Sequence, residues 1–178
     1  MRIVADELQA LQSRLQAPVG QSTEVAQPPV TVVTLVASLI APDALVASTS
    51  NYRGGPPTVW TVYAASRVAL AYVEVEFDQQ LYTADVERDV AKYRGEYAAA
   101  NVRVAWVRPL SRITELTVSR SVVFADTGRL NVAASVRFAG VDEPLVLPDQ
   151  CVMINDQQWE RADELLGIIR DGVGASRQ

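Results

Sequence analysis

The chain has 178 residues, and 49% of them are apolar, so it is long enough to bury the core of one domain. Its formal charge of −5 at pH 7 argues against nucleic-acid binding and against strong attachment to an anionic membrane. Histidine is absent and Cys151 is the only cysteine, which excludes a Cys–His catalytic pair, an internal disulfide and a thiolate metal site.

Residues 1–17 are predicted to form an amphipathic helix. Val4, Leu8, Leu11 and Leu15 recur at spacings of four, three and four residues, which places them in one apolar stripe. An isolated helix of this length is marginal in water, so the stripe must be covered. The domain itself, a second copy and a foreign protein are the alternatives, and these four residues are a candidate interaction surface.

Residues 18–29 are predicted to be a linker, because they are rich in Gln, Ser and Pro and end in Pro28-Pro29. No later stretch has the composition of a boundary. We therefore expect one domain over residues 30–173 and a frayed tail over residues 174–178.

The domain is predicted to begin with a two-sided strand from Val30 to Ile40, which is a β-branched run that is apolar on both faces. After a turn at Pro42-Asp43, residues 44–48 are expected to return as its hairpin partner. The breakers in residues 51–57 predict a loop, and the spacing of its glycines beside Arg53 matches no phosphate-binding motif.

Residues 58–64 and 67–77 are predicted to form the next pair of strands. In the second strand the apolar residues change from even to odd positions near Tyr72, which favours a bulge or a sharp bend there. Glu74 and Glu76 share the opposite face, and we interpret them as a solvated polar face and not as paired catalytic carboxylates.

A change to helical periodicity predicts an inserted amphipathic helix over residues 83–100, followed by a strand over residues 102–106. Residues 115–138 then form the clearest hairpin of the chain. Leu116, Val118, Val122 and Phe124 in the first run and every even position from Leu130 to Phe138 in the second are apolar, so we expect this face to be buried. Asp126-Thr127-Gly128 supplies the turn, with Gly128 at a positive φ.

A C-terminal helix is predicted to begin at Asn155 or Asp156 and to end at Gly172. Cys151 is interpreted as a small buried apolar residue. Because no run of about 20 apolar residues spans a bilayer and no signal-peptide core is found, we expect a cytoplasmic protein without a membrane span.

The order of elements resembles a pleckstrin-homology-like domain, and in particular the bacterial and GRAM-type branch of that superfold. Two stretches carry the resemblance: residues 61–70, a strand–turn–strand segment that passes through Arg67, and residues 109–116, which enter the later strands. It covers roughly Pro28 to Gly172. The inserted helix and the N-terminal helix have no counterpart in that pattern.

The resemblance implies an α+β fold, in which a curled antiparallel sheet or partly open barrel of about seven strands is closed by the C-terminal helix. Members that bind lipid headgroups use basic residues near an early hairpin loop. Here only Arg53 and Arg67 stand near such a position, and stable binding to anionic lipid requires several charges. Lipid-headgroup binding is therefore the least favoured function.

Two other functions remain open. The first, which we favour, is a non-catalytic protein-interaction or scaffolding module that binds a protein partner or associates with itself through the N-terminal helix. The second is a small-molecule-binding or enzymatic domain with an aromatic-lined cavity formed by Trp60, Tyr63, Tyr72 and Trp106. We identify no catalytic, cofactor-binding or metal-binding residue and expect no cofactor.

Overall fold

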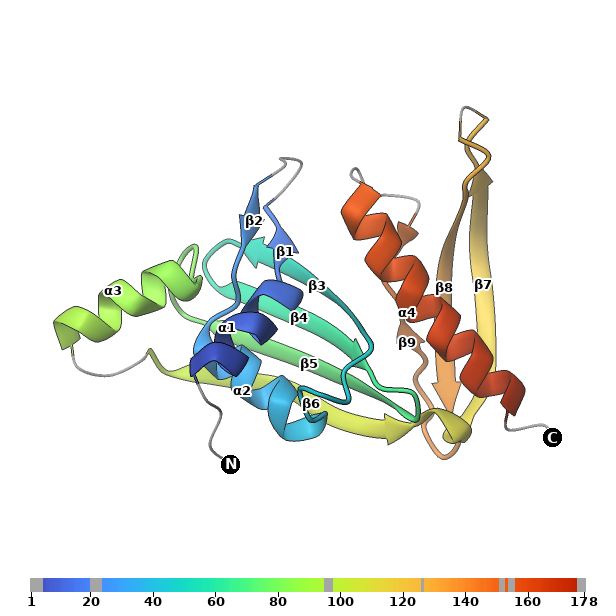
Figure 1. The fold of residues 1–178 in the computed structure, drawn as a ribbon, viewed down its shortest axis with the longest axis horizontal. Coiled ribbons are helices and arrows are strands. Elements are labelled where there is room, and N and C mark those ends of the chain that lie inside the picture. The colour runs from blue at the N-terminus through green and yellow to red at the C-terminus, as the bar shows by residue number, and fades with distance from the viewer. Residues whose placement is uncertain are drawn as a thin grey trace.

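The computed structural model describes residues 5–19, 24–94, 98–125, 127–150, 153 and 156–175. Within these residues the chain forms four α-helices and three antiparallel sheets of two, four and three strands, so the predicted α+β class is confirmed. Figure 1 shows two layered parts side by side. In the first, α1 and α2 lie against the four-stranded sheet, and in the second α4 lies against the three-stranded sheet.

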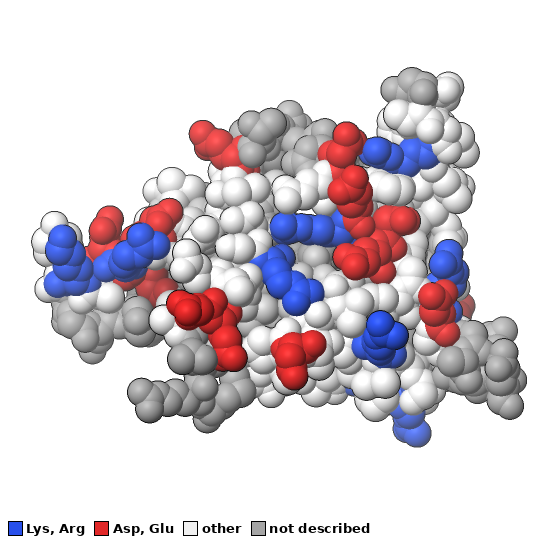
Figure 2. All heavy atoms as spheres, viewed as in Figure 1, with Lys and Arg blue, Asp and Glu red and all other residues white. Residues whose placement is uncertain are grey.

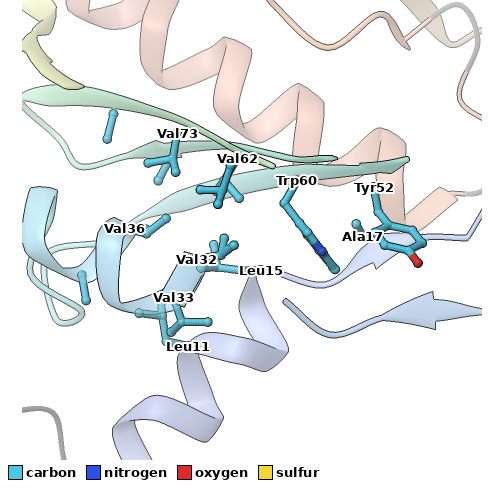
Figure 3. Close-up of a cluster of buried hydrophobic side chains, with 14 of the residues drawn as sticks. Leu11, Leu15, Ala17, Val32, Val33, Val36, Tyr52, Trp60, Val62 and Val73 are labelled. Carbon is cyan, nitrogen blue, oxygen red and sulfur yellow. The ribbon is translucent and has the colours of Figure 1, made fainter. Parts of the chain in front are cut away.

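The first part has the strand order β3–β4–β5–β6. Its elements are α1 (Ala5–Arg14), β1 (Ala17–Pro18), β2 (Val25–Ala26), α2 (Val30–Leu39), β3 (Ala47–Gly54), β4 (Thr58–Ala65), β5 (Ala69–Phe77), α3 (Ala84–Arg94) and β6 (Ala100–Pro109). Alternate residues of the central strands point toward the helices, as period-two geometry requires. Figure 3 shows Val62 and Val73 of the sheet directed toward Val32 and Val36 of α2.

The second part follows directly on β6 and has the strand order β7–β8–β9. Its elements are the 3-10 helix η1 (Leu110–Arg112), β7 (Ile113–Val123), β8 (Leu130–Phe138), β9 (Leu145–Val146) and α4 (Asp156–Ala175). A second apolar core forms where Leu165 and Ile169 of α4 meet Val136 and Phe138 of β8. The predicted hairpin is confirmed, and Gly128 of its predicted turn has a φ of 65°, whereas Asp126 lies outside the described residues.

The sheet is not a single curled sheet of about seven strands, and that prediction is wrong in this respect. Pro109 ends β6, and η1 then redirects the chain, so β6 and β7 belong to separate sheets. The C-terminal helix contacts β3 and β7, which places it between the two parts of the molecule. It therefore does not close the end of a barrel.

Of residues 30–40, which were predicted as a strand, Val30–Leu39 form the helix α2. Val32, Val33, Val36 and Ala37 are all buried, which is the spacing of one helical face and not of a strand. An apolar run of this length is ambiguous by periodicity, and tertiary burial overrides the β-propensity of valine. The carboxylate of Glu87 on α3 also accepts a hydrogen bond from the Val30 amide at 2.6 Å, at the start of α2.

Two neighbouring boundaries also differ from the predictions. The strand β3 covers Ala47–Gly54, so residues 51–54 belong to a strand and not to a loop. Within the stretch predicted as a linker, Pro18 pairs with Val25, and the next pair of this short ladder, Ala17 with Ala26, is buried in the first core. Residues 20–23 lie outside the described residues.

The predicted bulge at Tyr72 is absent from the pairing of β5 with β4, which is uninterrupted from Thr58↔Phe77 to Ala65↔Leu70. A register shift occurs only on the β6 side, between Glu74 and Val75. The change of phase has another cause: Leu70 belongs to the second core, whereas the odd positions up to Phe77 belong to the first.

Candidate interaction surface

The N-terminal stripe is covered by the domain itself. Leu11 and Leu15 are 3% and 0% exposed, and Leu8 packs at the margin of the same core. Figure 3 shows Leu11 and Leu15 directed from α1 toward Val32 and Val33 of α2. Val4 lies outside the described residues. Because Leu11 and Leu15 have almost no exposed surface, they cannot present the interaction surface that the sequence suggested.

The four aromatic residues proposed to line a cavity lie on opposite faces of the sheet. Trp60 is fully buried in the first core, where its indole Nε1 donates to the Tyr82 carbonyl at 2.8 Å. Tyr63, Tyr72 and Trp106 form a row on the other face, with ring centroids 5.1 and 5.8 Å apart. They stack on one another and enclose no common cavity with Trp60.

Glu74 and Glu76 lie beside this aromatic row. The Tyr72 hydroxyl donates to Glu74 Oε2 at 2.9 Å, and Arg103 forms ion pairs with both carboxylates. Burial, with a smaller contribution from the Glu74 charge, raises the pKa of Tyr63 to about 12, and burial likewise raises the pKa of Tyr72. The two tyrosines, the two carboxylates and Arg103 thus form one hydrogen-bonded and ion-paired polar network on this face of the sheet.

The structure does not bring Arg53 and Arg67 together. Both side chains are exposed. Arg53 pairs with Val59 near the start of β4, whereas Arg67 follows Ala65 at its end. At about 3.3 Å per strand residue, the two positions are roughly 20 Å apart. They therefore form no joint anion-binding cluster.

The outer half of the β7–β8 hairpin exposes an apolar surface, which we call the hairpin surface. It consists of Val118, Val122, Val123, Phe124 and Leu130, which are between 40% and 67% exposed. The strand register places Val118, Val123 and Leu130 on one face of the hairpin and Val122 on the other. Figure 1 shows this end of the hairpin projecting past α4, and Figure 2 shows uncharged atoms there next to basic side chains. The expectation that the whole even-numbered face is buried is wrong for Val118, Val122, Phe124 and Leu130. The register shift between Val118 and Arg120 turns Val122 to the face of Asn131, opposite that of the buried Val132.

The strand β7 is also an open edge. It pairs with β8 on one side only, and 9 of its 11 residues are exposed, as its burial pattern shows. Register shifts between Ile113 and Glu115 and between Val118 and Arg120 interrupt the ladder. An edge strand of this kind offers unpaired backbone N–H and C=O groups to another strand.

Charged residues next to the hairpin surface are already paired within the chain. Arg120 pairs with Asp149, Arg137 with Glu115 at 3.3 Å and Arg129 with Asp156 at 2.9 Å. The Arg129 guanidinium also lies 4.4 Å from the centroid of the Trp159 ring. The hairpin surface is thus apolar at its centre and carries balanced charges at its rim.

The sequence contained only a weak signal for this surface. Leu130 and Val118 follow the same alternation as the buried Val132 and Val136, and alternation does not show how far a covering helix extends. The run of Val122, Val123 and Phe124, which breaks the alternation, is the one feature that separates the outer half from the inner half.

Comparison with protein-family models, curated proteins and solved structures finds no match for this chain. In the part of the chain that the structure describes, no helix is long and apolar enough to cross a membrane. The same residues contain no group of three or more Cys, Asp and Glu side chains that could hold a metal ion. Cys151 lies outside the described residues, so its predicted burial stays a prediction.

Proposed function

We propose that the protein is a non-catalytic interaction module that associates with a second copy of itself through the hairpin surface and the edge of β7. The carrying observation is the coincidence of five exposed apolar side chains with an open edge strand. Contiguous exposed apolar surface on a soluble domain is typical of an interaction site.

A second copy suits this surface because a two-fold axis places identical patches face to face. Rim charges that are neutralised within each chain, such as Arg120 with Asp149, leave no strong like-charge repulsion across such an axis. Antiparallel pairing of β7 with its copy would extend the sheet and use up both open edges.

The geometry also favours a closed pair over an open fibre. At the other side of the sheet β9 has only two residues, so it offers little edge for further addition. The irregular register of β7 near Thr114 and Ser119 limits the length of flat edge that can pair. We therefore expect a dimer.

The test is the solution mass of the full chain, measured by light scattering over a range of concentrations. We expect the wild type to reach twice the mass of one chain. The double substitution Val118→Lys with Val123→Lys should raise the dimer dissociation constant about tenfold or more, because it places charge in the apolar contact.

Tyr93→Lys is the matched control, because Tyr93 is an 84% exposed apolar residue on α3, outside the hairpin. It should leave the dissociation constant unchanged. A wild type that stays monomeric at all concentrations, or a dimer that both sets of substitutions weaken equally, would contradict the proposal.

The resemblance to pleckstrin-homology-like domains stays a sequence-based prediction. The order of antiparallel strands followed by a C-terminal helix supports it, whereas the separate sheets depart from it. Lipid-headgroup binding gains no support, since Arg53 and Arg67 lie at opposite ends of β4.

A further inference from the structure

The strand β6 is an open edge of the four-stranded sheet. Among the described residues it pairs with β5 only, and none of its ten residues is buried. Its ladder with β5 is uninterrupted over residues 104–109, a length of about 20 Å. The unpaired backbone N–H and C=O groups of such an edge can pair with another strand.

An apolar stripe runs along this edge on the face of the sheet that the helices cover. It consists of Val102, Ala105 and Val107, each of which pairs with a residue of β5 that is buried in the first core. Val102 and Val107 are nevertheless 43% and 41% exposed, because no further strand lies beside them. The helix α2 contacts both β5 and β6. Alternate side chains of an added strand would therefore extend the first core past β6.

Three arginines gather at the end of β6 that leads into η1. The Leu110 amide donates to the Val68 carbonyl at 2.9 Å, which brings the turn that contains Arg67 next to Arg108 and Arg112. Arg67 and Arg112 are exposed, and Arg108 is half-buried. Within the described residues none of the three forms an ion pair with a carboxylate. This end of the edge is therefore basic in a chain whose formal charge is −5.

These arginines indicate the chemistry of the partner. Guanidinium groups bind carboxylates through charge-assisted hydrogen bonds, and complementary charge selects one partner over another. Glu115, which follows Arg112 by three residues, is paired with Arg137 at 3.3 Å, so this carboxylate is not available to the three arginines. Carboxylates of another protein would pair with Arg67, Arg108 and Arg112.

We propose that the edge of β6 binds an extended peptide of a partner protein, with apolar residues at alternate positions and acidic residues at the end next to Arg108. Backbone pairing along β6 provides affinity, and the apolar stripe selects the alternate side chains. The arginines select the acidic end and fix the direction of the peptide. This surface is separate from the hairpin surface, so the inference goes beyond the proposed dimer.

The test selects binders for the full wild-type chain from a display library of random peptides long enough to cover β6. Affinities of the selected peptides are then measured by fluorescence anisotropy for Val107→Lys and for the double substitution Arg67→Gln with Arg112→Gln. Val25→Lys is the matched control for the valine, since Val25 of β2 is 44% exposed. Arg53→Gln is the control for the arginines, because Arg53 is an exposed residue of β3.

We expect selected peptides that combine acidic residues with alternating apolar residues. Val107→Lys should weaken their binding about tenfold or more, because it places a charge in the apolar stripe. The double arginine substitution should weaken binding about fivefold at low salt and less at high salt. Both controls should bind like the wild type.

Hydrogen exchange of the wild type provides a test that depends on no variant. A selected peptide should slow amide exchange in residues 104–108 and leave β7 unchanged. The double substitution Val118→Lys with Val123→Lys should bind the peptides like the wild type, which separates this proposal from the proposed dimer.

The proposal would be overturned if the library yielded no binder or only binders without acidic residues. It would also be overturned if Val107→Lys bound the peptides as tightly as Val25→Lys. Peptides that instead protect β7, or a lower solution mass of Val107→Lys without any selected peptide, would assign strand addition to the hairpin or to a second copy and would likewise contradict it.

Discussion

The two parts of the molecule share one architecture, an antiparallel sheet packed against helices. They differ in how much of the sheet the helices cover. In the first, two helices and the β1–β2 pair cover the sheet, and Trp60 and Phe77 are fully buried. In the second, the single helix α4 crosses a hairpin that is longer than the helix can cover, so Val123 is 67% exposed. The difference separates residues that hold the fold from residues that are free to bind.

The largest expected effect on stability comes from removing a side chain at the centre of the first core. Trp60→Ala should lower the free energy of unfolding by about 3–5 kcal/mol, because it removes the largest fully buried side chain and leaves a cavity. It also deprives the Tyr82 carbonyl of its indole donor and Tyr52 of a ring 4.9 Å away. Urea unfolding, followed by circular dichroism, measures the change.

The matched substitution in the second part is Phe124→Ala. Phe124 is 42% exposed, so its removal should change the free energy of unfolding of the monomer by only about 0.5 kcal/mol. If both aromatic substitutions cost the same, the distinction between a covered and an open part would be wrong.

A second effect concerns the buried carboxylate that supports α2. Glu87 is 1% exposed, and its Oε2 accepts from the Val30 amide where no side chain of α2 caps the helix. Glu87→Ala should therefore cost about 1–3 kcal/mol of unfolding free energy, since it leaves buried helix-end donors without an acceptor. Glu87→Gln retains an acceptor and should cost less.

The same residue predicts a dependence on pH. Burial raises the pKa of Glu87 above its ordinary value of 4.5, although hydrogen bonds from Val30, Tyr82 and Thr31 oppose the shift. A raised folded pKa means that the stabilising contribution of the protonated form is fully present below pH 4.5 and is lost as the pH rises through the folded pKa.

The difference in unfolding free energy between Glu87→Gln and the wild type should therefore shift in favour of the variant when the pH is raised from about 4 to about 8. A difference between the two proteins that stays constant with pH would show that the carboxyl group titrates alike in the folded and unfolded chains.

The sequence predicted the elements whose pattern is local. The β7–β8 hairpin, the helices α3 and α4 and the strands β4 and β5 follow from alternation, helical spacing and the turn at Gly128. The sequence-based prediction was wrong where tertiary contacts determine the secondary structure. The valines of α2 form a helix because one face of it packs against the sheet and Glu87 accepts a hydrogen bond at its start.

The candidate surface was predicted least well for the same reason. Spacing identified the stripe of Leu11 and Leu15 but could not show that α2 and the sheet cover it. It likewise could not show that Val118 and Leu130 stay exposed while Ala134, the partner of Val118 in β8, is buried in the second core. Whether an apolar stripe is core or interface depends on the position of another element, and a single stretch of sequence does not contain that position.

The smallest expected effect concerns two glycines of α4, Gly167 and Gly172. Gly172 was predicted to end this helix, but the helix continues to Ala175, and a Cβ on Gly172 would lie 2.8 Å from Leu110 Cβ. Gly167 lies in the same helix with no atom within 4 Å of such a Cβ. Glycine is therefore required at 172 for close packing on η1 and is dispensable at 167.

Gly167→Ala should raise the free energy of unfolding by about 0.5–1 kcal/mol, because alanine restricts the unfolded chain and favours the helix. At Gly172→Ala the same gain is offset by overpacking, which typically costs about 1–3 kcal/mol, so the net change should be a loss of up to about 2 kcal/mol. Denaturant unfolding of both variants measures the difference directly. Equal gains would mean that α4 can move away from Leu110 without cost, and that the second part is as loosely fixed at its inner end as at its exposed outer end.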